Sequence, residues 1–210
     1  TSALEAIAKT NYFQDDDSFK FNVTHDYPRR QKKKMDKSGI TPEAVICTYE
    51  IDSNLINEIE SDLGKDTLES REFSVITKYD NENSWSNIKI NKKKFIENIT
   101  TKLGISSKVL NDKLLKVQTK ENLADLKSEY SDEKYTKGLS EFDKYFKNEW
   151  NWDNDSISEY VSRVYLKPNK PKFLYYDEYF SLPSRISIEK LENSNLDEYE
   201  LKTAKALFEL

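Results

Sequence analysis

The chain has 210 residues, and its 33 Lys and Arg residues against 38 Asp and Glu residues give a formal net charge of −5 at pH 7. This balance excludes a global basic field for nucleic acid, while local basic patches have to be judged separately. The 13 Tyr and 10 Phe exclude a disordered solvating tail, and four Gly are few for an enzyme that holds phosphates through glycine-rich backbone.

Cysteine and histidine content restricts the metal and disulfide chemistry. Cys47 is the only cysteine and His25 the only histidine, so an intrachain disulfide is excluded and a typical structural zinc site lacks ligands. No apolar run approaches the roughly 20 residues that a membrane-spanning helix needs, so we expect no membrane partner. No signal-peptide pattern precedes the first predicted helix, and we expect a cytoplasmic location.

A helix is predicted at the start of the chain, over residues 1–12. Leu4 and Ile7 lie three residues apart and share one helical face. Thr1 and Ser2 open this helix, where hydroxyls and free backbone N–H groups gather at the positive end of the dipole. Such an end favours an anion, most commonly a phosphate.

A short half-buried strand is predicted next, because Phe19, Phe21 and Val23 alternate with polar residues. Pro28 then disfavours a continuous helix through residues 24–34.

Basic side chains gather around this proline. In a DNA-linked protein such a run can contact phosphates, and it can also reach a nucleotide or a partner subunit. The alternative is a solvated charged loop, since Asp26 and Asp36 weaken the local field. The candidate phosphate or nucleic-acid contacts are His25, Arg29, Arg30 and Lys32, and the run continues through Lys33 and Lys34.

The middle of the chain alternates strands and a helix. Residues 44–51 are the clearest strand, rich in β-branched and aromatic residues. A helix capped by Asp52 follows and ends at Gly64. Strands are predicted over 73–79 and 85–90, close enough to pair as a hairpin.

From Asn91 the apolar pattern becomes helical. The stripes are interrupted by Gly, Asp and Asn, whereas a long coiled coil needs unbroken heptads, so we expect a compact helical insertion. Trp85, Trp150 and Trp152 are predicted to be core residues rather than base-stacking platforms. The predicted helices lie near residues 95–99, 110–117, 123–130, 135–150 and 157–165, and a short strand follows a proline-containing linker at 173–180.

The first seven residues, Thr-Ser-Ala-Leu-Glu-Ala-Ile, resemble the segment that follows the Walker A lysine in SMC/RecF-type ATPases of the ABC class. This resemblance implies that Thr1 ligates Mg²⁺, that Ser2 lies close to the phosphates, and that ATP and Mg²⁺ are cofactors of the parent protein. The glycine-rich loop and its lysine are absent, so we expect an internal fragment that is inactive alone. The alternative is an ordinary surface helix with a Thr-Ser start.

Two later segments, Leu182–Ile188 and Thr203–Leu207, resemble a region that follows the insertion in bacterial AAA-family ATPases. Asp177 and Glu178 end an apolar run and so imitate a Walker B motif. No Leu-Ser-Gly-Gly-type helix precedes them, so we expect a strand end or an acidic interface here and the true Walker B beyond Leu210. The resemblance also implies a second ATPase head as a homodimer partner, and DNA as a further partner.

The sequence therefore predicts an α+β fold with two parts. Residues 1–90 are expected to form a partial P-loop ATPase head with a helix and an antiparallel β-subdomain, and residues 91–210 a mainly helical insertion or arm. The predicted function is that of a fragment of an ATP-binding and ATP-hydrolysing SMC/RecF-like protein, linked to DNA or to phage defence. The alternatives are a non-catalytic helical protein-interaction module and the ATPase part of an overcoming-lysogenization-defect-type nuclease.

Overall fold

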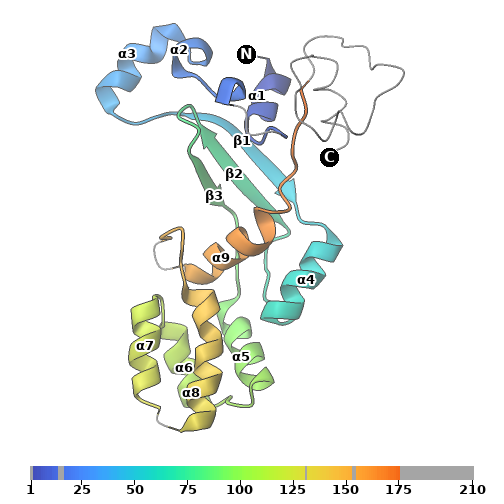
Figure 1. The fold of residues 1–210 in the computed structure, drawn as a ribbon, viewed down its shortest axis with the longest axis vertical. Coiled ribbons are helices and arrows are strands. Elements are labelled where there is room, and N and C mark those ends of the chain that lie inside the picture. Colours follow the sequence, from blue (N-terminus) through green and yellow to red (C-terminus); the bar gives the residue numbers. More distant parts are fainter. Residues whose placement is uncertain (1, 14–16, 131, 153–154, 176–210) are drawn as a thin grey trace, which may run out of the picture. The chain divides into compact units, whose positions relative to one another are not determined.

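The computed structural model describes residues 2–13, 17–130, 132–152 and 155–175 (Figure 1). The chain forms two compact units, each assembled from separate stretches of sequence. Unit 1 comprises Thr1–Ile46, Ile76–Asn83 and Pro171–Leu210, and unit 2 comprises Cys47–Val75 and Ser84–Lys170.

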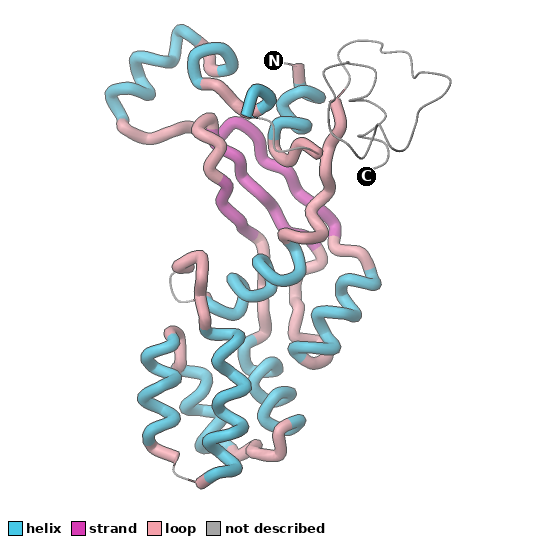
Figure 2. The backbone as a smooth tube through the Cα atoms, viewed as in Figure 1, coloured by secondary structure: helices cyan, strands magenta, loops and turns pink. Residues whose placement is uncertain are grey.

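A three-stranded antiparallel sheet with the order β1-β2-β3 confirms the α+β class (Figure 2). The strands are β1 (Glu43–Glu50), β2 (Glu72–Lys78) and β3 (Asn83–Ser86). The pairing of β2 with β3 confirms the predicted hairpin. Its turn contains Asn81 at a φ of 68°, a left-handed conformation that asparagine tolerates well.

The third strand is shorter than predicted. It was expected to run over 85–90, but β3 ends at Ser86, and Asn87 follows with a φ of 65°. A left-handed residue breaks the extended backbone, so pairing resumes only at Ile90, which forms an isolated antiparallel bridge with Leu68.

Unit 1 begins with α1 (Ala3–Lys9), which confirms the first predicted helix, and continues with η1 (Asp17–Phe19), α2 (Val23–Asp26) and α3 (Arg29–Ser38). Pro28 separates α2 from α3, as predicted.

The strand predicted over residues 19–23 is wrong. Asn22 caps α2 by accepting a hydrogen bond from the Thr24 N–H, so Val23 starts a helix. The backbone of Phe21 is paired with the Asn81 side chain instead of with a neighbouring strand: its N–H donates to Oδ1 and its carbonyl accepts from Nδ2.

Unit 2 is mainly helical, as predicted for most of its length. Helix α4 begins after the Asp52 cap and ends at Gly64, whose φ of 96° suits a residue without a side chain. A Cβ at Gly64 would also lie within 2.4 Å of the Asn98 side chain. The helical elements are α4 (Ser53–Leu63), α5 (Lys92–Lys102), α6 (Lys108–Lys116), α7 (Lys120–Ser128), α8 (Glu133–Ser140), η2 (Glu141–Phe146), α9 (Ser156–Val161) and η3 (Ser162–Leu166), the last a π-helical turn.

The long helix predicted over 135–150 is divided and ends early. Helix α8 passes at Glu141 into the 3₁₀ turns of η2, and Asn148 then takes a φ of 47°. The helical side chains form one apolar core in which Phe95, Phe142 and Phe146 are almost fully buried.

The predicted core position holds for Trp85, which packs against this core. Trp150 and Trp152 are only half-buried, and they extend a row of rings from Trp85 with centroid separations of 5.6 and 6.0 Å.

At the far end of the described chain, Phe173 forms an isolated parallel bridge with Tyr12. The remainder of the predicted strand at 173–180, with Asp177 and Glu178, lies outside the described residues, as do the segments 182–188 and 203–207. Within the part that the structure describes, every helix is too short or too polar to cross a membrane.

Candidate binding site

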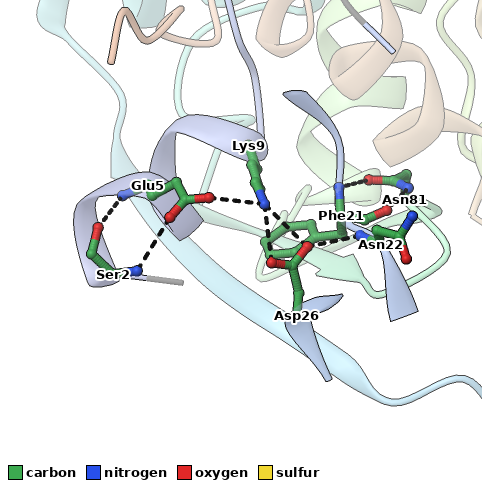
Figure 3. A network of polar contacts seen from close by, with 7 residues as sticks. All are labelled: Ser2, Glu5, Lys9, Phe21, Asn22, Asp26 and Asn81. Atoms are coloured by element: carbon green, nitrogen blue, oxygen red, sulfur yellow. Dashed lines mark hydrogen bonds and ion pairs between the residues drawn. The ribbon is translucent and has the colours of Figure 1, made fainter. Parts of the chain in front are cut away.

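The start of α1 is closed by a reciprocal pair of hydrogen bonds (Figure 3). Ser2 Oγ accepts from the Glu5 N–H at 3.1 Å, and the Ser2 N–H donates to Glu5 Oε2 at 3.4 Å. This capping box explains why the opening residues predict the start of a helix. The Ser2 hydroxyl keeps its proton for donation, and Thr1 lies outside the described residues, so their contacts with nucleotide and Mg²⁺ stay predictions.

A lysine on the same helix is the centre of a larger network. Lys9 Nζ lies 3.0 Å from Glu5 Oε1 and donates to Asp26 Oδ1 and Oδ2 at 3.1 and 3.0 Å (Figure 3). The side chains of Lys9 and Asp26 are only 9% and 7% exposed. The network therefore joins α1 to α2 through an ion pair that is largely shielded from water.

The electrostatics of this network keep Lys9 charged. Burial by itself would lower the pKa of Lys9, but hydrogen bonds and ion pairing with Glu5 and Asp26 outweigh it and raise the pKa. Asp26 also accepts the Asn22 N–H at 2.8 Å, so the carboxylate is held from both sides.

A pocket of about 360 Å³ opens beside the end of α1. Its wall contains three lysines, three asparagines and aromatic rings, but no acidic residue from the part of the chain that the structure describes. The wall is formed by Lys9, Thr10, Asn11, Tyr12, Phe13, Phe19, Lys20, Thr77, Asn81, Asn83 and Lys172. These residues come from segments far apart in the chain, and no local pattern in the sequence marked them as a site.

The basic run lies on two short helices rather than in the loop that the alternative prediction assumed. His25 is exposed on α2, and α3 carries Arg29, Arg30 and Lys32, of which the arginines are exposed and Lys32 is half-buried. Lys33 of the predicted run is also exposed on α3, and the structure adds Lys37 as a further exposed lysine of this helix.

A second polar cluster lies within unit 2, around Asp62. Its Oδ1 accepts from Lys144 Nζ at 2.6 Å and from the Tyr145 hydroxyl at 2.9 Å. Its Oδ2 accepts from the hydroxyls of Tyr160 and Tyr165 at 2.8 and 3.0 Å. With four donors on its two oxygens, the carboxylate is occupied by protein groups, and we assign it a structural role.

Burial alone would raise the pKa of Asp62, but these hydrogen bonds, first that of Lys144, lower it below the usual range. Burial and the Asp62 charge raise the pKa of Tyr165 to about 12. The hydroxyls therefore stay protonated as donors at neutral pH.

Among the described residues, no group of three or more His, Cys, Asp or Glu side chains is arranged to hold a metal ion. Comparison of the chain with protein-family models, with curated proteins and with solved structures gave no match.

Proposed function

We propose that the chain is part of an ATP-binding and ATP-hydrolysing protein of the SMC/RecF-like type that acts on DNA. The nucleotide half of this proposal is supported by the resemblance of residues 1–7, by the helix that starts at Ala3, and by the antiparallel sheet that follows it in the chain. Thr1 and Ser2 would contribute oxygen ligands and donors toward Mg²⁺ and phosphate. A phosphate loop, a Walker B motif and a second head would come from outside these residues.

The observation that carries the DNA half is the unbalanced charge of α3. Six of its ten residues are Lys or Arg and one is acidic, although the whole chain is acidic. Arg29, Lys33 and Lys37 follow one another at i,i+4 spacing, which places like charges side by side at a cost in helix stability. No ion pair joins these three, Arg30 or Lys32 to an acidic side chain of the described residues.

The first turn of α3 increases this cost. Arg29 and Arg30 occupy its first turn, which holds no acidic residue, and there the helix dipole disfavours positive charge. A sequence that breaks local stability rules in this way points to a partner that supplies the missing negative charge.

The chemistry of the surface favours nucleic acid over a membrane. A helix that binds in the membrane interface needs an apolar face with residues such as Trp, Phe or Leu, and Met35 is the only apolar residue of α3. Basic residues repeat every four positions, about 6 Å along the helix, which suits contacts to a phosphate backbone.

DNA binding is tested by fluorescence anisotropy of a labelled duplex over a series of salt concentrations. The fourfold variant Arg29→Gln, Arg30→Gln, Lys33→Gln and Lys37→Gln should bind more weakly, and its plot of log affinity against log salt should be flatter by roughly 3 to 4 units, because each phosphate contact contributes about 0.9.

The matched control removes four exposed lysines of unit 2, with the variants Lys93→Gln, Lys102→Gln, Lys108→Gln and Lys120→Gln. It should keep the salt slope of the parent chain. Equal losses in both fourfold variants, or no loss in the α3 variant, would contradict the assignment of α3 to DNA.

The codons that precede Thr1 in the gene test the nucleotide half. A Gly-x-x-Gly-x-Gly-Lys sequence there is expected. Its absence would favour the helical interaction module, and an acidic metal-binding domain downstream would favour the nuclease version of the ATPase.

A further inference from the structure

Among the described residues, the wall of the pocket in unit 1 contains lysine side chains and no acidic side chain. Lys20 and Lys172 lie far apart in the sequence but contribute to the same wall. Lys20 pairs with Asp17 at 2.6 Å, but the Asp17 side chain is 94% exposed, and a surface pair of this kind is worth little and is readily exchanged. Lys172 is exposed and has no ion pair with any described residue.

An amide adds a further donor to this wall. The Thr77 hydroxyl donates to Asn83 Oδ1 at 2.7 Å, which uses the acceptor side of the amide. Asn83 Nδ2 is then the side that is left to donate. Two ammonium groups and an amide N–H₂ together match a ligand rich in acceptor oxygens, above all a phosphate.

Aromatic rings form another part of the wall. The rings of Tyr12 and Phe19 lie 4.1 Å apart with a 30° tilt, and Phe13 meets Tyr12 edge-on at 4.8 Å. Planar groups bind well against the faces and edges of such rings. A phosphate and a planar ring on one molecule would use both parts of the wall.

The segments that carry these groups are fixed by hydrogen bonds. The Phe13 N–H donates to the Phe173 carbonyl, and Asn11 Nδ2 donates to the Pro171 carbonyl at 2.7 Å, which holds Lys172 beside the end of α1. The Asn81 side chain accepts a hydrogen bond from the Phe21 N–H and donates one to the Phe21 carbonyl, which fixes the backbone next to Lys20. A wall whose backbone is already ordered loses little entropy when a ligand binds.

We infer that this pocket binds a small organic phosphate that carries a planar ring, a ligand the size of a mononucleotide. The volume of about 360 Å³ falls within the range of small-molecule sites. The pocket lies at the Lys9 end of α1, about 10 Å along the helix from Ser2, so it is separate from the phosphate position proposed above.

Isothermal titration of the chain with AMP, adenosine, inorganic phosphate and ribose 5-phosphate tests this inference. AMP should bind more tightly than the other three, because only AMP has both the ring and the phosphate. The double variant Lys20→Gln and Lys172→Gln should weaken AMP binding by about tenfold or more, since each lysine supplies a charge-assisted hydrogen bond.

The control variant Lys102→Gln and Lys108→Gln carries the same change of charge on exposed residues of unit 2 and should bind AMP like the parent chain. Both double variants alter surface lysines, and circular dichroism checks that they fold. The inference is overturned if AMP fails to bind at about 5 mM, if adenosine or ribose 5-phosphate binds equally well, or if the two double variants behave alike. None of these outcomes depends on ATP hydrolysis or on residues before Thr1.

Discussion

At the scale of single residues, we expect the charged side chains that are shielded from water together with their partners to contribute most to stability. Asp62 accepts four hydrogen bonds and is 17% exposed, while Lys9 and Asp26 are still more shielded. A buried charge is tolerable only while its partner remains, so these positions should respond strongly to substitution.

Replacing Asp62 with Asn should destabilise the protein by about 3 kcal/mol at pH 7, because a carboxylate that accepts hydrogen bonds from Lys144 and tyrosine hydroxyls is lost. Since the pKa of Asp62 is lowered in the folded state, its contribution is complete above the unfolded-state pKa and disappears as the pH falls through the folded-state value. Urea unfolding of Asp62→Asn and of the parent chain, at pH 7 and at about pH 3, measures the loss of stability under both conditions.

The matched control for this change is Asp112→Asn, which alters an exposed carboxylate on α6. It should change stability by less than about 0.5 kcal/mol. If the free energies of unfolding of Asp62→Asn and the parent chain differ as much at low pH as at pH 7, the charge of the carboxylate is not what stabilises the cluster.

Replacing Lys9 with Met should cost about 3 kcal/mol or more, because it removes the ammonium group that pairs with the shielded Asp26 carboxylate. Adding Asp26→Asn should restore part of the loss, since the amide oxygen can still accept the Asn22 N–H without burying a charge. Thermal unfolding of the single and double variants measures this. A double variant less stable than Lys9→Met would contradict the ion-pair explanation.

At the scale of elements, the sequence predicted the helices and strands whose formation depends on residues within or beside them. β1, β2 and α4 follow from β-branched content, the Asp52 cap and Gly64, all of which lie within or beside the element. The strand predicted at Phe19–Val23 failed because the partner of Phe21 is Asn81, some 60 residues away. Such a partner leaves no trace in a short window of sequence.

The candidate sites divide in the same way. Ser2 and the basic run could be selected as candidates from the sequence, because helix caps and clusters of charge are formed by residues that are neighbours in the chain. The pocket wall was not, because Lys20, Thr77 and Lys172 meet only after folding. The Asp62 cluster was likewise hidden, since its tyrosines lie more than 80 residues further along the chain.

At the scale of the whole molecule, the two units interleave in the sequence. Unit 1 takes residues from the start, the β2–β3 turn and the end of the chain, while unit 2 fills the intervals between them. The predicted division into 1–90 and 91–210 rests on where strand patterns give way to helical patterns, and such patterns can indicate contiguous parts only. The net charge of −5 similarly conceals the basic surface of α3 within an acidic chain.

The central claim is that Thr1 and Ser2 belong to an ATP site, and steady-state ATP hydrolysis by the parent protein, extended both before Thr1 and beyond Leu210, tests it most directly. We expect Mg²⁺-dependent hydrolysis that Thr1→Ser retains and Thr1→Ala reduces by at least about tenfold, because in the proposed site the Thr1 hydroxyl would ligate the metal. The control Thr101→Ala, on the exposed side of α5, should leave the rate unchanged. Absence of hydrolysis, or equal rates for Thr1→Ala and the parent protein, would contradict the claim.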